Sequence, residues 1–473
     1  MSRRHIVATF ILAGLGALAS SARAEVKLPE VFSDGAVLQR GVPIVVWGYA
    51  AAGEKVTVTL DGQSASAVAE KIKAKGGTKH LPADSWWQVA LPARKAGGPF
   101  TMTVKGANTI EVKDVLVGDV WLASGQSNMD VRTPKPIAEA DRRPTVRQFT
   151  GHHPGYKKGA YPLGKWTTGG YWYLTAWPFA KAVADSQKVP VGILCCARGG
   201  SPVSTWRAQK KFHAPHPKYP ACYSLYIEPI MPFRIKGAIW WQGENDSWGL
   251  ASDRKRLRYR DAFSEVITGW RKEWGQGDFP FLYVQLQRRP ASKPFAATPT
   301  AWQWGNLGQS LNWIHIRDGQ RLTLALPSTA MVVSFDVTPS GDLHPTASEK
   351  QKIGRRLALA AEAVAYGKDV EWSGPLFKAV SIKDGKVVVE FTHTTGGLVA
   401  QGGALKEFQV GNSRGFADVD AAIEGNTVTF PAKGLPRSFQ VRYAWHIYPH
   451  GNLYNGKGLP ASPFLSDPVG QKK

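Results

Sequence analysis

Cysteines, long apolar runs and acidic residues are all scarce in this sequence, and each scarcity excludes a class of protein. The three cysteines, Cys195, Cys196 and Cys222, are too few for a disulfide scaffold or a four-ligand zinc site. We expect core thiols, with one disulfide from Cys222 to Cys195 or Cys196 as the alternative. No apolar run after residue 24 is long enough to span a bilayer, so we expect no stable membrane insertion.

Basic residues outnumber acidic ones, 59 to 36, and the formal net charge is +23. Such a charge favours acidic partners, such as polyanionic glycans, anionic lipid surfaces or nucleic acid. The lysines and arginines are scattered, however, and no nucleic-acid-binding motif of the helical, zinc-finger or RNP type is present. We therefore expect no nucleic-acid partner; an acidic polysaccharide is a better candidate than DNA, and simple solvation of the surface is a better explanation than either.

Metal-binding patterns are also missing. Two histidine-rich patches, His152-His153 and His213 with His216, have no acidic or cysteine residues at a matching spacing. We therefore expect neither a metal nor another cofactor.

Residues 1–24 have the pattern of a signal peptide. Arg3 and Arg4 precede a short apolar run, and Ala22-Arg23-Ala24 matches the A-x-A cleavage pattern. The mature chain should begin near Glu25 and be exported, either to the periplasm or out of the cell. Ser2-Arg3-Arg4 also resembles a twin-arginine signal, although two arginines open ordinary secretory signals too.

The rest of the chain divides into three parts by its hydrophobic pattern. Residues 25–113 contain short alternating runs such as Val56-Thr57-Val58-Thr59-Leu60, which predict an N-terminal β-sandwich domain. Residues 369–473 contain similar runs, and we expect a C-terminal β domain and tail there. Residues 114–368 have a different pattern, in which hydrophobic runs alternate with helical spacing.

This middle part is predicted to be an α/β domain with a parallel sheet and helices on both faces. Near-continuous hydrophobic runs, typical of parallel strands buried on both faces, cover residues 115–123, 191–197, 238–241, 281–286 and 330–335. Apolar residues at helical spacing from Leu257 to Trp274 predict one helix. The capping-box pattern Thr346-Ala347-Ser348-Glu349 predicts the start of another.

Polar motifs follow several of these strands, and the carboxyl ends of parallel strands share one rim of a sheet. The motifs are Gly125-Gln126-Ser127-Asn128, Arg198-Gly199-Gly200-Ser201, Gln242-Gly243-Glu244-Asn245-Asp246 and Asp342-Leu343-His344-Pro345. Each by itself is explained as an ordinary turn or loop. Together they contain a hydroxyl, a base, a carboxylate and oxyanion donors, which are the groups that acyl transfer needs. The combination favours a serine hydrolase.

Ser127 is the candidate nucleophile, although Met129 replaces the second glycine of an α/β-hydrolase elbow. His344 is the candidate general base, which takes the serine proton and returns it to the leaving alcohol. Asp342 is the expected acid that orients His344, and Asp336 is its rival.

The oxyanion requires hydrogen-bond donors close to the nucleophile. We expect the backbone N–H groups of Ser127 and Gly200 to supply two of them. A side-chain amide from Gln242 or Asn245 would complete the set.

The motifs GQSNM, GGS, WWQGEND and DLHP, in this order, resemble the SGNH-hydrolase superfamily and, more closely, its sialate O-acetylesterase-like family of carbohydrate esterases. The resemblance extends to both ends of the mature chain and to the pair Arg317 and Gln320. The matching segments at the ends are residues 31–40, 47–48, 441–445, 452–455 and 458–464. It implies a flavodoxin-like SGNH domain flanked by β domains, and a serine esterase that removes acetyl groups from sugar hydroxyls without a metal.

Two features depart from the family pattern. Asp342 and His344 are spaced D-x-H where the superfamily usually has D-x-x-H, which leaves the identity of the acid open. Arg198 stands beside the glycine pair where a small residue is expected. It either forms a salt bridge, the simpler interpretation, or binds an acidic sugar. Trp302 and Trp304 are candidates for the wall of a sugar-binding cleft.

We therefore expect an exported serine O-acetylesterase that acts on an acetylated carbohydrate through an acyl-enzyme on Ser127. The substrate is sialic acid or a plant-type polysaccharide such as xylan, pectin or xyloglucan. Two alternatives remain: an SGNH esterase or thioesterase on lipid-like acyl groups, and a non-catalytic glycan-binding protein. The oligomeric state stays open.

Overall fold

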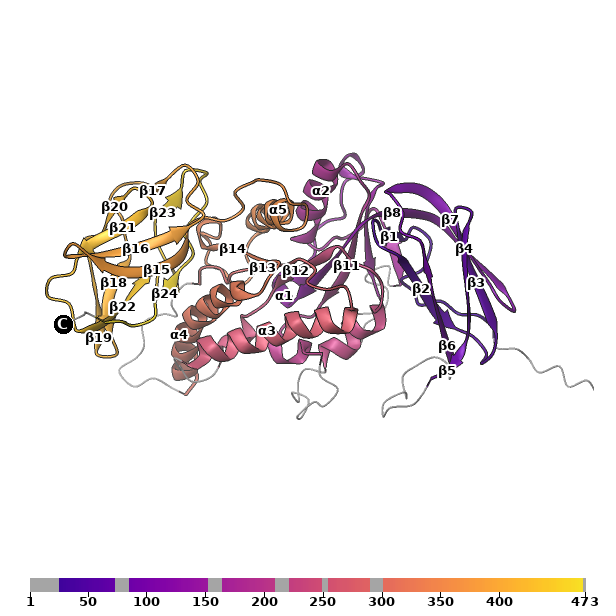
Figure 1. Ribbon diagram of the computed structural model, residues 1–473, viewed down its shortest axis with the longest axis horizontal. Coiled ribbons are helices and arrows are strands. Elements are labelled where there is room, and N and C mark those ends of the chain that lie inside the picture. The colour runs from indigo at the N-terminus through magenta and orange to yellow at the C-terminus, as the bar shows by residue number, and fades with distance from the viewer. Residues whose placement is uncertain are drawn as a thin grey trace, which may run out of the picture.

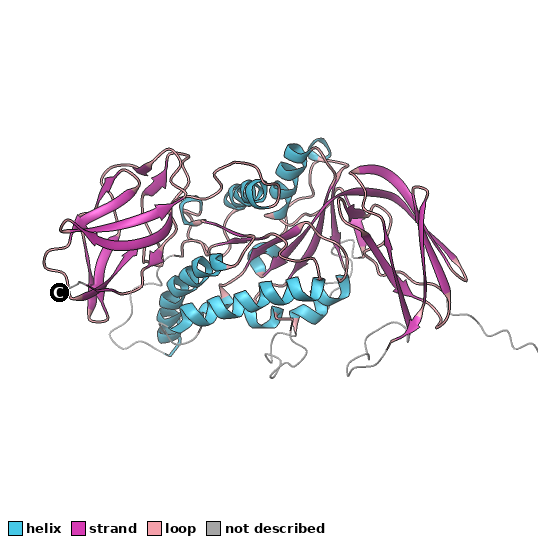
Figure 2. Cartoon of the chain, viewed as in Figure 1, coloured by secondary structure: helices cyan, strands magenta, loops and turns pink. Residues whose placement is uncertain are grey.

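The computed structural model describes residues 25–72, 85–151, 164–208, 221–248, 254–289 and 301–470, and only the backbone of residues 254–255 and 301–311. The predicted signal peptide and both histidine-rich patches lie outside these residues. Figure 1 shows an elongated molecule with the N-terminal strands at one end and the C-terminal strands at the other. The helices gather in the middle (Figure 2). None of the helices described is long and apolar enough to cross a membrane.

A largely parallel sheet forms the middle of the molecule. Its parallel strands lie in the order β9-β11-β8-β12-β13-β14, and β10 adds an antiparallel edge. The bounds are β8 Thr109–Gly125, β9 Val146–Thr150, β10 Lys165–Thr167, β11 Val191–Ala197, β12 Gly237–Trp241, β13 Phe281–Val284 and β14 Thr329–Val332. The predicted mixed α/β fold with a central parallel sheet is confirmed.

Helices cover both faces of this sheet. They are α1 Ser127–Asp130, α2 Ala176–Gln187, α3 Arg254–Trp274, α4 Ala301–Leu322 and α5 Ala347–Val364. Neighbouring residues of β12 point to opposite faces, as the period of a strand requires. Trp240 stacks on Phe263 of α3, with ring centroids 5.6 Å apart, whereas Trp241 belongs to the core beneath α2 and α5. The predicted capping box on Thr346 is present and begins α5.

Strand β8 connects the middle sheet to the N-terminal strands. Its first half pairs with β7 and β1, and its second half pairs with β11 and β12. The N-terminal strands are β1 Val37–Gln39, β2 Ile44–Tyr49, β3 Lys55–Leu60, β4 Gln63–Val68, β5 Glu70–Lys71, β6 Ser85–Leu91 and β7 Gly97–Lys105. The domain boundary predicted between residues 113 and 114 therefore falls inside one continuous strand.

The C-terminal residues form further sheets around their own core. Their strands are β15 Leu376–Lys383, β16 Lys386–Thr392, β17 Leu398–Ala400, β18 Phe408–Asn412, β19 Gly415–Asp418, β20 Ala422–Glu424, β21 Thr427–Pro431, β22 Ser438–Tyr443, β23 Leu453–Asn455, β24 Phe464–Leu465 and β25 Val469–Gly470.

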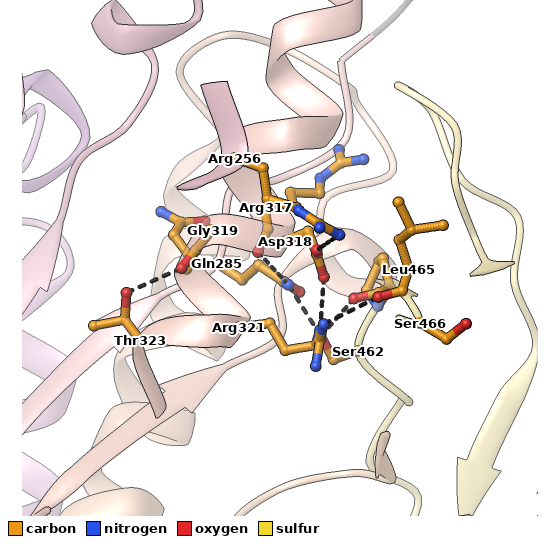
Figure 3. A network of polar contacts seen from close by, with 12 residues as sticks. Arg256, Gln285, Arg317, Asp318, Gly319, Arg321, Thr323, Ser462, Leu465 and Ser466 are labelled. Atoms are coloured by element: carbon orange, nitrogen blue, oxygen red, sulfur yellow. Dashed lines mark hydrogen bonds and ion pairs between the residues drawn. The ribbon is translucent and has the colours of Figure 1, made fainter. Parts of the chain in front are cut away.

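Hydrogen bonds fasten these strands to the middle of the molecule (Figure 3). Arg321 of α4 donates to the Leu465 carbonyl oxygen at 3.3 Å, and Gln285 Nε2 donates to Ser462 Oγ at 3.0 Å. Arg317 is fully buried and donates to carbonyl oxygens on both sides of the junction. The junction therefore depends on directed polar contacts as well as on apolar packing.

Candidate active site

Ser127 stands where β8 ends and α1 begins, between two buried residues. Gly125 has a φ of 129°, and a Cβ there would lie 2.2 Å from the Trp241 carbonyl oxygen, so only glycine fits. The Gln126 N–H donates to that same oxygen at 2.9 Å. The tight turn leaves Ser127 partly exposed, and its Oγ makes no hydrogen bond within the described residues.

The glycine turn after β11 lies against this serine. A Cβ added to Gly199 would lie 3.7 Å from Ser127 Cβ. Gly200 has a φ of 74°, and its carbonyl oxygen accepts a hydrogen bond from Asn245 Nδ2. The structure therefore brings Ser127, Gly200 and Asn245 together at the carboxyl ends of three adjacent strands.

The two candidate amides have different surroundings. Gln242 is fully buried. Its Nε2 lies within hydrogen-bond distance of three acceptors, namely Gln126 Oε1, Ser201 O and Asp246 Oδ2. Asn245 is partly exposed, and its side chain bonds only to Gly200 among the residues described. Because an amide nitrogen has two hydrogens, Asn245 retains one for a ligand, whereas both hydrogens of Gln242 are used inside the protein.

His344 lies on the exposed loop before α5. The carbonyl oxygen of Leu343, the residue before it, accepts hydrogen bonds from Asn128 Nδ2 at 2.9 Å and Gln287 Nε2 at 3.0 Å. Partial desolvation, and then the positive charge of Lys350, lower the pKa of His344 below its ordinary value of 6.5. Its imidazole makes no hydrogen bond to Ser127 or to a carboxylate within the described part of the chain.

The two candidate acids differ in their availability. Asp336 accepts two hydrogen bonds from Arg356, both 2.6 Å long, and these side chains are only 10% and 15% exposed. Asp342 is exposed, and its carboxylate has no partner among the described residues. Asp342 is therefore the carboxylate near His344 that is not already bound to a cation.

Arg198 makes no ion pair in the described part of the structure. The salt bridge expected as its simpler interpretation therefore has no partner there. Burial raises the pKa of the Cys222 thiol to about 11, and the Arg198 charge opposes this effect, so the guanidinium lies near Cys222. All three cysteines are buried and free. Arg198 itself is partly exposed.

The tryptophans expected at a cleft wall, Trp302 and Trp304, lie in the first turn of α4, where side chains are not described. A different tryptophan is exposed beside the site. Trp248 directly follows the short helical turn Asn245–Ser247 and is 52% exposed. The sequence feature that could have singled out Trp248 is its position close after the WWQGEND motif. The described residues hold no group of three or more potential metal ligands.

Lys350 is a further residue that sequence reasoning missed. It lies in the first turn of α5 and is completely buried, and its Nζ donates to Asn128 Oδ1 at 2.5 Å. A lysine in a helix is normally solvated, so no sequence pattern indicated its position.

A serine on a tight strand-end turn, with a glycine turn and an amide beside it, is suited to ester hydrolysis. The comparisons with known proteins agree, and the chain is a carboxylic ester hydrolase. Residues 117–363, just over half of the chain, match the family described as "Carbohydrate esterase, sialic acid-specific acetylesterase". The chain belongs to this family, which confirms the resemblance seen in its motifs.

Relatives match over nearly their whole length. Sialate O-acetylesterase of Rattus norvegicus is 27% identical, and the match covers 89% of this chain and 90% of the rat protein. The Homo sapiens enzyme is 26% identical over 89% and 88% of the two chains. Among solved structures, a carbohydrate acetylesterase from Xanthomonas citri is 34% identical with a TM-score of 0.78, and the match covers 94% of this chain and all of the other.

Proposed function

We propose that this protein is an exported serine O-acetylesterase of carbohydrates. Its catalytic part would be a flavodoxin-like SGNH domain of about residues 114–368, between β domains of residues 25–113 and 369–473. The observation that carries the proposal is the convergence of Ser127, Gly200 and Asn245 at one rim. In addition, Asn128, the residue after Ser127, donates a hydrogen bond to the carbonyl oxygen of Leu343, the residue before His344.

In the first half of the reaction, Ser127 Oγ attacks the carbonyl carbon of the acetyl group and His344 takes the serine proton. The carbonyl electron pair moves to its oxygen, which the N–H groups of Ser127 and Gly200 and the free N–H of Asn245 stabilise. The intermediate then collapses, and the bond to the sugar oxygen breaks. The sugar leaves as an alcohol with the proton that His344 held.

In the second half, water attacks acetyl-Ser127 while His344 takes a proton from the water. Collapse of this intermediate releases acetate and returns the proton to Ser127. Asp342 orients His344 and stabilises its charged form. Catalytic hydrogen bonds are often long in unliganded enzymes. We therefore expect the exposed loop of His344 to bring the imidazole into contact with Ser127 and Asp342 when substrate binds.

Two side chains support an acidic sugar as the substrate, and O-acetylated sialic acid is the favoured one. Arg198 presents a guanidinium with no ion-pair partner among the described residues, beside the glycine turn, and such a group is suited to a carboxylate. Trp248 presents an exposed ring beside Asn245, suited to the apolar face of a pyranose. Acetylated xylan, pectin and xyloglucan are the alternatives.

The decisive measurement is acetate release by the mature protein from O-acetylated sialic acid and the three acetylated polysaccharides. Ser127→Ala and His344→Ala should each lower turnover on the order of a thousandfold or more while remaining folded. Arg198→Gln should lower kcat/KM for the sialic acid more than for neutral xylan. Full turnover by Ser127→Ala would overturn the mechanism.

The same assay separates the two alternative functions. A preference for long-chain over acetyl nitrophenyl esters would indicate a lipid-type esterase. Binding of a glycan without release of acetate from any substrate would indicate a non-catalytic glycan-binding protein.

A further inference from the structure

Asn128, the residue after the proposed nucleophile, is a buried junction between three segments of the site. Its Nδ2 donates to Glu244 Oε1 at 2.5 Å, on the loop after β12, and to the Leu343 carbonyl oxygen at 2.9 Å, on the loop of His344. Its own Oδ1 and backbone carbonyl oxygen both accept from Lys350 Nζ, at 2.5 and 3.2 Å. Both Nδ2 hydrogens and the Oδ1 acceptor of this side chain are therefore engaged inside the protein.

Lys350 is the cationic member of this junction. Its ammonium group lies 4.4 Å from the centroid of the Trp241 ring, and the residue is completely buried. Burial of an ammonium group costs free energy unless the group is paired and hydrogen-bonded. A buried lysine at this position therefore calls for a structural or functional explanation. Solubility and surface charge do not explain this lysine, because its side chain does not reach solvent.

We infer that Lys350 is a positioning residue for the reaction, acting on Ser127 through Asn128, and on His344 through the Leu343 carbonyl and through its own positive charge. This inference rests on the proposed function. A shift of Asn128 would move both the serine beside it and the loop that it holds. Misplacement of a catalytic group by about 1 Å can cost a hundredfold in rate.

The charges around Lys350 come from several elements. Glu244 faces it from the loop after β12, and Glu349 lies beside it on α5. Glu244 also faces Arg289, from the segment after β13, and its charge opposes the lowering of the Arg289 pKa by burial. Burial lowers the pKa of Lys350 to about 7, and the two carboxylates oppose this effect.

The consequence for His344 has a definite sign. A positive neighbour disfavours the imidazolium, so Lys350 lowers the pKa of His344 and keeps the base neutral to lower pH. Without this charge the imidazolium becomes easier to form. The acidic limb of the kcat/KM profile should then move to higher pH.

The test compares Lys350→Met with Lys352→Met, because Lys352 lies two residues further along α5 on its exposed face. For Lys350→Met we expect kcat to fall by about tenfold to a hundredfold, with KM little changed. The acidic limb of kcat/KM should move to higher pH. Lys352→Met should match wild type in both readouts.

A third variant separates charge from geometry. Lys350→Arg keeps the positive charge in a different shape, so its acidic limb should stay at the wild-type pH while kcat falls. If Lys350→Met does not fold, Asn128→Ala tests the same bridge without changing a charge, and it should lower kcat at unchanged KM.

The inference is overturned if Lys350→Met retains wild-type kcat and pH profile, or if a folded Asn128→Ala variant retains wild-type kcat. Failure of the proposed function is recognised separately, because Ser127→Ala would then be as active as wild type whatever the Lys350 variants do.

Discussion

The proposed active site has two halves, one with the proposed nucleophile and one with the proposed base, and they are built differently. The nucleophile half, with Ser127, Gly200 and Asn245, follows directly on strand ends, and the neighbouring side chains of Gln126 and Gln242 are buried and hydrogen-bonded. The base half is an exposed loop in which neither Asp342 nor His344 has a side-chain hydrogen bond among the described residues. Its backbone is held at Leu343, whose carbonyl oxygen accepts from Asn128 and Gln287, and at Asp342, whose N–H donates to Ser340 Oγ.

The difference shows how a parallel sheet prepares a site. Hydrogen bonds between strands fix the positions of strand ends, so turns that directly follow a strand are also held in fixed positions. A loop is held in a fixed position only where hydrogen bonds to its backbone hold it. The oxyanion donors should therefore be preorganised, whereas the contact between His344 and Ser127 should form with the substrate.

The largest effect should separate the two amides within the nucleophile half. Asn245→Ala should lower kcat by about a hundredfold to a thousandfold with little change in Tm, because it removes a proposed oxyanion donor. Gln242→Ala should act mainly on stability, on the order of 2 kcal/mol, since it removes the buried side-chain hydrogen bonds that Gln242 makes to Gln126, Ser201 and Tyr259. Steady-state kinetics and thermal melts of both variants check this. The reverse pattern would assign the oxyanion role to Gln242.

A smaller effect should separate the two acids of the base half. Asp342→Ala should lower kcat by about tenfold or more with unchanged stability, because the carboxylate would contact His344 only in the reacting complex. Asp336→Ala should reduce the free energy of unfolding by about 3 kcal/mol, because it leaves the Arg356 guanidinium unpaired. Denaturant unfolding beside kinetics distinguishes them. A larger loss of kcat in Asp336→Ala would identify that residue as the acid.

The smallest effect concerns the pH at which the base half becomes active. His344 must be neutral to accept a proton, and its pKa is lowered from 6.5. The acidic limb of wild-type kcat/KM should therefore have its midpoint below 6.5, and activity should fall as pH decreases through that midpoint. A pH series with an acetyl ester measures it. A midpoint above 6.5 would mean that a carboxylate already pairs with His344 in the free enzyme.

Much of the fold could be predicted from local pattern. The buried strands, the helix ending at Trp274 and the capping box on Thr346 each depend on residues close together in sequence, and each appears in the structure. Helix α4, which begins at Ala301, is not predicted from the sequence. The boundary at residues 113 and 114 also has no structural break, because β8 continues through it.

The sequence by itself determined which chemical groups are present and in what order, and its four motifs were sufficient to indicate the family. Only the tertiary structure decided which groups are free to act. Gln242 and Asn245 are both amides three residues apart, yet Gln126 and Ser201 occupy the first, whereas the second has only the Gly200 carbonyl as a side-chain partner among the described residues. Likewise, Lys350 is an ordinary helical lysine in the sequence, whereas Asn128 and Trp241 contact its ammonium group in the folded structure. Burial and hydrogen-bond partners depend on contacts between residues far apart in the sequence, such as Asn128 and Lys350, and those contacts exist only once the chain has folded.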